Sequence, residues 1–435
     1  MTTPDPAPPR RPYIVLGELE VTITGPGKKT VHGAATFHYN HQQTGSVWLE
    51  LRGGQPTWPF HAPVKVFAKG LKPFEAQCAG PQLRQSGGAL AVSERFILSR
   101  EPLESVKANN LKQVVFALLD CPFPKGNARE SGGVSLRPFA FRCAQFDIKL
   151  GAPVAAHQAV TKDLGSIPRT VTHTGTLQQQ DGSAFDSETG QVALGTAADA
   201  VSFAAGRWIA QSQVEGLDET GSRKWFLWGT SRVSPPTTTY SWFHPDHPEW
   251  LTLACNGLLE FKNRSAESED ILSKVLYWYI RSNTMGAGVD GSLILTMCAL
   301  ELLSWFVIVR RSGAVSEAGY GQLANAAERL RLMLTLLGMP RGIPVGLADF
   351  TTFAKREKWP DMTVALVEAR NYLVHPTQSR SGRPRTNKDF PWYELWSGAQ
   401  WLLELTVLRL IGYDGDYHNR TRLRDLHRVE HVPWT

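Results

Sequence analysis

The chain has 435 residues, of which 42% are hydrophobic and 20% are charged. This balance is ordinary for a folded globular protein and excludes a largely disordered chain, and the length predicts two or three domains with cores of their own. The net charge of +6 permits a polyanionic partner such as nucleic acid but does not identify one.

The N-terminal residues 1–12 are rich in proline and have no apolar core. We therefore expect a disordered tail, and neither a signal peptide nor a membrane anchor. The most apolar run of the chain, residues 293–309, is interrupted by Glu301 and Ser304. Because a membrane span needs about 20 apolar residues, this run favours a buried helix of a bundle.

The cysteines provide information about the cellular compartment. They are Cys78, Cys121, Cys143, Cys255 and Cys298. They are widely spaced, odd in number and never arranged as Cys-x2-Cys, which predicts reduced thiols in a cytoplasmic protein, and neither a disulfide framework nor a zinc site.

Residues 13–150 alternate apolar and polar side chains with a period of two, in short runs separated by glycine and proline. This pattern is typical of antiparallel strands and predicts a sandwich or a partly closed barrel. Residues 154–221 are richer in small residues, with strand-like pieces at 201–208 and then at 224–228. They form either the second half of the same sandwich or a small separate unit. We assign residues 13–250 to one β-rich domain.

Histidines in the first part of the chain suggest a metal site only superficially. His32, His38 and His41 lie near one another, but no cysteine or acidic residue has the spacing of a further ligand. His244 and His247 lie between prolines, so we interpret them as part of a turn. The sequence therefore predicts no metal site. The abundant aromatic residues could stack on bases, although aromatic residues on strands usually fill a core.

From Leu251 onward the apolar period becomes that of helices, after a boundary marked by prolines. The predicted helices are 268–282, 289–311, 317–337, 361–375 and 391–411. The loops between them are short, which predicts an antiparallel all-α bundle over residues 251–435. Residues 412–420 are expected to form a turn after the last helix, with His418 in a structural role.

The string RNYLVHP, residues 370–376, ends the fourth predicted helix. Pro376 disfavours the helical conformation at His375, so we expect this imidazole at the helix end. Asn371 and His375 are four residues apart and share one helix face, and the long side chain of Arg370 can reach the same pocket. A planar cation, an amide and a base that titrates near neutrality therefore converge.

This set of groups suits cleavage of a phosphodiester next to a 2′-hydroxyl, because an imidazole moves the proton and a guanidinium stabilises the developing charge. Such chemistry requires no metal. The spacing alone is a weak signal, since Arg422 and His427 repeat it in a polar tail.

The string RNYLVHP resembles the Arg-Asn-x3-His signature of HEPN domains, helical bundles that are often metal-independent ribonucleases. The segments GSLILTMCALELLSW, AAERLRLMLTLLGMP and QWLLELTVLRLIGYDGDYHNR look like the ApeA-type branch, which is found in bacterial anti-phage defence proteins. The resemblance covers about residues 255–420, and over the first 250 residues it is only general. It implies a multidomain α+β chain in which a β-rich, sandwich-like regulatory domain precedes an all-α HEPN bundle.

The resemblance also implies an activity. It suggests a cytoplasmic endoribonuclease of abortive infection that needs no cofactor, cuts cellular RNA such as tRNA and works as a homodimer through the HEPN domain. His375 would be the general acid–base group, Arg370 the phosphate clamp and Asn371 a group that orients one of them. The N-terminal domain would respond to a phage-derived trigger.

Two further features accompany this motif. Residues 377–388 form a basic stretch without an acidic residue, placed either to contact RNA phosphates or simply as a solvated loop. Its basic residues are Arg380, Arg383, Arg385 and Lys388. Glu301, in the apolar helix, is a candidate buried acid that either holds Arg370 in place or faces a gap in the packing.

Two other functions remain open at this point. One is a HEPN protein that does not cut RNA but binds RNA or a nucleotide, or acts only in dimerisation. The other is a metal hydrolase that uses the scattered histidines. The intact set of Arg370, Asn371 and His375 favours the nuclease over the non-catalytic protein.

Overall fold

The computed structural model describes residues 13–40, 46–52, 58–86, 89–98, 103–123, 126–130, 133–137, 139–151, 171–228, 234, 239–286, 288–374, 390–422 and 428–434. The chain divides into two compact units. The first unit comprises Met1–Phe139, Phe146–Leu194 and Ile209–Pro236, and the second comprises Ala140–Gln145, Gly195–Trp208 and Thr237–Thr435. A β-rich region thus precedes a helical region, which confirms the predicted α+β multidomain architecture.

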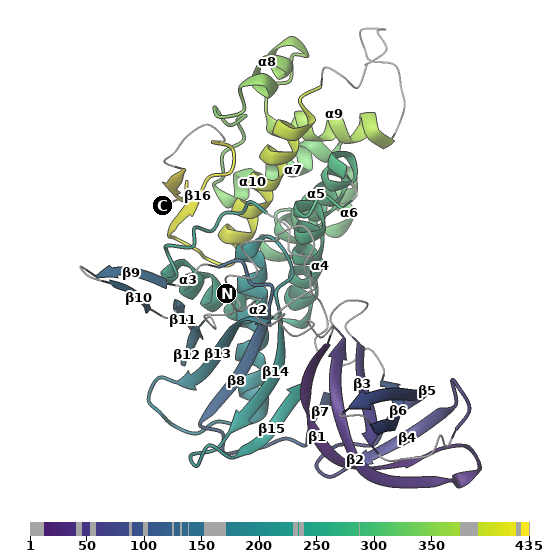
Figure 1. Ribbon diagram of the computed structural model, residues 1–435. Helices are drawn as coiled ribbons and strands as arrows, with labels where there is room; N and C mark the ends of the chain where they lie inside the picture. The colour runs from purple at the N-terminus through teal and green to yellow at the C-terminus, as the bar shows by residue number, and fades with distance from the viewer. Residues whose placement is uncertain are drawn as a thin grey trace, which may run out of the picture. The chain divides into compact units, whose positions relative to one another are not determined.

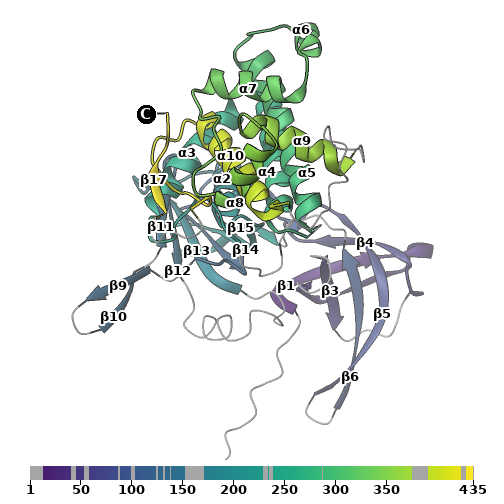
Figure 2. The ribbon, with the colours of Figure 1, turned by 90° about the horizontal axis from the view of Figure 1, so that it is seen from above.

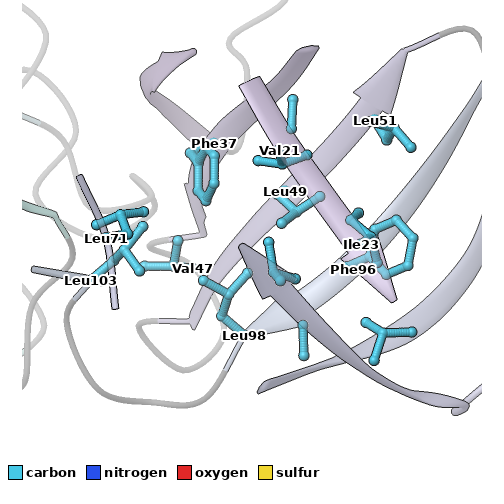
Figure 3. Close-up of a cluster of buried hydrophobic side chains, with 14 of the residues drawn as sticks. Val21, Ile23, Phe37, Val47, Leu49, Leu51, Leu71, Phe96, Leu98 and Leu103 are labelled. Atoms are coloured by element: carbon cyan, nitrogen blue, oxygen red, sulfur yellow. The ribbon is translucent and has the colours of Figure 1, made fainter. Parts of the chain in front are cut away.

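The first six strands close into a barrel in the order β1-β2-β3-β6-β5-β4, with antiparallel neighbours throughout (Figure 1). The strands are β1 Tyr13–Thr24, β2 Thr30–Asn40, β3 Ser46–Arg52, β4 Pro63–Ala68, β5 Phe74–Ser86 and β6 Ala89–Leu98. Alternate side chains such as Ile23, Phe37, Leu49 and Phe96 point into one apolar core (Figure 3). The period-two pattern therefore builds a closed barrel, where we had expected a sandwich or a partly closed barrel.

A seven-stranded sheet in the order β11-β12-β13-β8-β14-β15-β7 follows the barrel. Its strands are β7 Leu103–Glu104, β8 Gln113–Leu119, β11 Phe139–Cys143, β12 Phe146–Gly151, β13 Val171–Gln179, β14 Ala210–Leu217 and β15 Arg223–Trp228. A separate hairpin pairs β9 Gly126–Glu130 with β10 Gly133–Arg137. The expected strand at 224–228 is β15.

The strand expected at 201–208 is wrong, because residues Ser187–Ala205 form helix α2. Alanine has the highest helix propensity, and this segment is rich in it. The Asp186 carboxylate accepts a hydrogen bond from the backbone N–H of Thr189 at 2.7 Å, which is the contact of a helix N-cap. The run Val201-Ser202-Phe203 resembles a strand by itself, but the alanines on both sides favour a helix.

The second unit is mainly helical. Its helices are α3 Glu249–Asn263, α4 Ala266–Asn283, α5 Gly288–Trp305, α6 Glu317–Gln322, α7 Ala326–Leu337, α8 Ala348–Arg356, α9 Met362–Val374 and α10 Trp392–Leu410. A π-helical segment, Phe306–Arg311, continues α5. We had expected one helix over 317–337, but the Asn325 side chain accepts a hydrogen bond from the N–H of Glu328 and starts α7 anew. Helices α3 and α8 were not predicted.

Helix α5 with its π-helical extension, Gly288–Arg311, is the one described segment long and apolar enough to span a membrane. Within the second unit it is a core helix, since α5 contacts α4, α7, α9 and α10, and Figure 1 shows these helices side by side. Leu293, Met297 and Leu300 are fully buried. The burial explains its apolar composition without a membrane, as the sequence had indicated.

The chain after α10 was expected to form a turn, but it also contains a short strand. Gly412 has the left-handed conformation that often ends a helix, and Asp416–His418, β16, then pairs with Val429–His431, β17. Just beyond β16, Arg420 is almost completely buried. The polar sequence of residues 412–420 did not predict that Arg420 would be buried.

Arg420 belongs to a buried polar network with Glu404 of α10 and Tyr279 of α4. The Nη2 atom of Arg420 lies 3.1 Å from Glu404 Oε1, and the Tyr279 hydroxyl donates a hydrogen bond to the same oxygen at 2.7 Å. The Arg420 guanidinium also donates to the Asn283 side chain at 2.7 Å and to the carbonyl of Tyr240. Burial raises the pKa of Glu404 to about 7, although Arg420 and Tyr279 oppose that rise.

Candidate functional site

The candidate site is built on the last turns of α9, and Asp361 fixes where that helix begins. The Asp361 carboxylate accepts hydrogen bonds from the N–H of Val364 at 3.1 Å and from the Thr363 hydroxyl at 2.7 Å. It is itself held by Arg331 Nε of α7 at 2.7 Å. This capped start sets the rotation of α9 and hence the positions of the residues that follow.

One face of α9 is buried in the bundle, and the motif lies next to it. Leu366 and Ala369 are fully buried, whereas Arg370 and Asn371 are half-buried. The side chain of Val374, the last described residue of the helix, is exposed. The polar motif residues therefore lie at the boundary between the packed core of the bundle and solvent.

The guanidinium of Arg370 has two polar neighbours. Its Nη1 donates a hydrogen bond to Asn371 Oδ1 at 3.2 Å, and its Nη2 lies 3.7 Å from Glu301 Oε1 on α5. The side chains of Arg370 and Glu301 are 35% and 36% exposed, so Glu301 is not the buried acid that we expected. At this exposure the ion pair contributes little stability, but it restricts the orientation of the guanidinium.

Cys298 also faces this cluster, and sequence analysis missed it. It lies one helical turn before Glu301 on α5 and is the exposed cysteine of the five. Burial and the nearby Glu301 carboxylate raise the pKa of its thiol, while the Arg370 cation lowers it. The three-residue spacing to Glu301, which places both on one helix face, was the available signal.

The thiol of Cys298 can report on the charges at the site. Replacing Arg370 with Ala removes the cation that lowers the thiol pKa, so alkylation by iodoacetamide near neutral pH is expected to slow by a few-fold. Glu301→Gln should have the opposite effect. Mass spectrometry can quantify the modified peptide. Equal rates in the wild type and both variants would show that the thiol does not sense these charges.

Several predicted site residues lie outside the described residues. They are His375, Arg380, Arg383, Arg385 and Lys388. The structure therefore brings together Arg370, Asn371 and Glu301 from α9 and α5, and the place of the imidazole and of the basic stretch remains a prediction.

Two other described histidines, His247 and His418, have local partners. His247 Nδ1 lies 2.9 Å from Glu249 Oε1, and its ring stacks on Trp250. Partial burial lowers the pKa of His418, whose Nδ1 lies 3.1 Å from the carbonyl oxygen of Ser241. Within the described ranges, no group of three or more His, Cys, Asp or Glu residues could hold a metal ion.

Two parts of the sequence are similar to domains of YopA-type proteins. Residues 265–431 match the model of the YopA C-terminal domain, and residues 106–239 match the model of the YopA central domain. The first range includes Glu301, Arg370, Asn371 and His375. The barrel strands β1–β6 precede both ranges.

A particular relative is the SPbeta prophage-derived uncharacterized protein YopA of Bacillus subtilis (strain 168). The two sequences are 27% identical over 266 residues, which cover 61% of this chain and 58% of the relative. The chain thus matches a little over half the length of that protein. No solved structure matches the chain.

Proposed function

We propose that this chain is a metal-independent endoribonuclease of the HEPN type that acts in anti-phage defence. The observation that carries the proposal is the geometry of Arg370, whose guanidinium is oriented by Asn371 and Glu301 while a third of its side chain is open to solvent. In sequence, this cation is followed five residues later by His375 and then by Pro376.

The proposed reaction uses the 2′-hydroxyl of RNA as its nucleophile. His375 accepts the proton of that hydroxyl while the 2′-oxygen bonds to phosphorus, and the bond from phosphorus to the 5′-oxygen breaks. The imidazole then returns a proton to the departing 5′-oxygen, so the products are a 2′,3′-cyclic phosphate and a 5′-hydroxyl. Arg370 stabilises the extra negative charge on the phosphorane, and Asn371 holds the guanidinium in place.

The biological setting is part of the same proposal. The substrate is cellular RNA such as tRNA, the active form is a homodimer through the helical domain, and the location is the cytoplasm. The β-rich region responds to a phage-derived trigger. The basic residues of 377–388 bind phosphates on either side of the cleaved bond.

The proposal is tested by sequencing RNA ends after induced expression of the wild type and of His375→Ala, with and without phage infection. We expect new ends bearing 2′,3′-cyclic phosphate only with the wild type in infected cells, and the same cleavage in EDTA by the purified protein once an extract of infected cells supplies the trigger. Matching RNA ends from both proteins under all conditions would support the non-catalytic alternative. Loss of activity in EDTA would support a metal hydrolase.

A further inference from the structure

The outer surface of β4 in the barrel combines exposed aromatic and basic side chains. Along this strand Val64 and Val66 are buried in the barrel core, whereas Pro63, Lys65 and Phe67 point outward. Successive outward residues are roughly 7 Å apart, since a strand rises about 3.3 Å per residue. Within the sequence FHAPVKVFAKGLK, residues 60–72, Lys65 and Phe67 thus lie on the outer face of the strand, and the other exposed cations and rings lie in the segments that flank it.

The exposed aromatic and basic residues of this strand and its flanks are Phe60, His61, Lys65, Phe67, Lys69 and Lys72. We call them the β4 surface. Phe67 is 40% exposed and Phe60 is 66% exposed. The Lys65 ammonium lies 5.9 Å from the centroid of the Phe67 ring. Both phenylalanine side chains are therefore accessible to a partner.

Neighbouring strands extend this surface with polar groups. Phe67 is paired across the ladder with Thr22 of β1, and Thr22 with His32 of β2. Figure 2 shows the barrel that contains β1 and β4. The Thr22 hydroxyl and His32 Nδ1 are hydrogen-bonded at 2.8 Å. One row across three strands therefore carries a ring, a hydroxyl and an imidazole.

The charge of the surface favours an anion. Lys28 and Lys29, both exposed, lie in the turn that joins β1 to β2, at the end of the ladder near Lys65. The acidic neighbours are Glu75, paired with Lys65, and then Glu20 and Glu18 farther along β1. With the three lysines of the β4 surface, cations outnumber acids by five to three among the described residues of this region. Cations interleaved with exposed rings match alternating phosphates and bases better than an apolar partner.

We propose that the β4 surface binds single-stranded nucleic acid, with bases stacked on Phe67 and Phe60 and phosphates bound by Lys65, Lys69 and Lys72. Single strands fit because only unpaired bases expose their faces to a side chain. This binding site lies in the first unit and does not depend on the proposed nuclease activity.

The test measures binding of a fluorescent oligothymidylate of about 15 nucleotides by anisotropy, using the full chain. DNA lacks the 2′-hydroxyl, so the proposed cleavage cannot interfere. Phe67→Ala is expected to weaken binding roughly ten-fold, and Phe67→Trp should retain it because a larger ring still stacks. Lys65→Gln should weaken binding roughly five-fold at about 0.1 M salt and reduce the salt dependence by about 0.7 in the log–log slope.

Two matched controls are available. Lys149→Gln removes an exposed lysine from β12, and Tyr277→Ala removes an aromatic side chain of similar exposure from α4. Both should bind like the wild type. Unchanged binding by Phe67→Ala, or an equal loss in Lys149→Gln and Lys65→Gln, would overturn the proposal, as would stronger binding of the duplex of the same sequence. Its failure leaves the cleavage experiment unaffected, because that experiment changes only His375.

Discussion

Arg370→Ala is expected to slow RNA cleavage by roughly 10²- to 10³-fold, which is the usual cost of removing one group that stabilises the charge of a transition state. The fold should survive, because the side chain is partly exposed and its ion pair with Glu301 contributes little stability. Arg370→Lys should recover only part of the rate, since an ammonium keeps the charge but cannot replace the planar two-nitrogen fork. Initial rates on a purified RNA substrate measure both effects.

Arg422→Ala is the matched control for this experiment. Arg422 precedes His427 by the same spacing, and its exposed side chain forms an ion pair with Glu430. We expect full cleavage activity from this variant. If Arg422→Ala lost as much activity as Arg370→Ala, a general loss of positive charge would explain the effect, and the site on α9 would not.

Arg420→Met is expected to destabilise the protein by about 3–5 kcal/mol at neutral pH, because it leaves the Glu404 carboxyl buried without its cation. Both side chains are only 2% exposed, so solvent cannot replace the lost partner. Tyr279→Phe, which removes one hydrogen bond to Glu404, should cost about 1–2 kcal/mol. Denaturant unfolding followed by tryptophan fluorescence measures these changes in the free energy of unfolding.

The pH dependence provides a second test of this pair. The folded-state pKa of Glu404 is raised from 4.5 to about 7, so its contribution to stability is present at low pH and is lost as pH rises from about 4.5 to 7. In Arg420→Met the folded pKa should rise further, and the loss should continue above pH 7. Adding Glu404→Gln should remove this extra pH dependence. If the stability of the single and double variants changed with pH in parallel, the extra pH dependence would not come from Glu404.

The candidate helix was well predicted from sequence because local signals determine it. Residues Met362–Val374 have a helical period, and Pro376 limits the end. The contact between Arg370 and Glu301 was one of two options left open, since a long side chain on α9 can reach α5 in a bundle. The partial exposure of Glu301 depends on how the helices rotate against each other, which no sequence pattern determines.

Other features depend on tertiary structure and were missed. Alternation of apolar residues is the same in a sandwich and in a barrel, so strand closure from β1 to β4 could not be derived from it. The nine-residue helix α8 is too short for its period to stand out. Arg420 looked like a residue of a polar turn because Glu404, the acid that allows its burial, lies on a different element.

The two units are interleaved along the chain, and this affects how the protein can be dissected. Residues Gly195–Trp208 belong to the helical unit although strands of the first unit both precede and follow them. There the Phe203 ring packs against Tyr279 at 5.1 Å between centroids, and the Gly206 carbonyl accepts a hydrogen bond from Asn283 at 2.9 Å. A fragment starting near residue 251 would lack Phe203 and Gly206, so it would uncover the Tyr279 ring and leave the Asn283 amide without this acceptor. Inactivity of such a fragment would therefore reflect damaged folding. Point substitutions in the intact polypeptide are the sounder genetic approach.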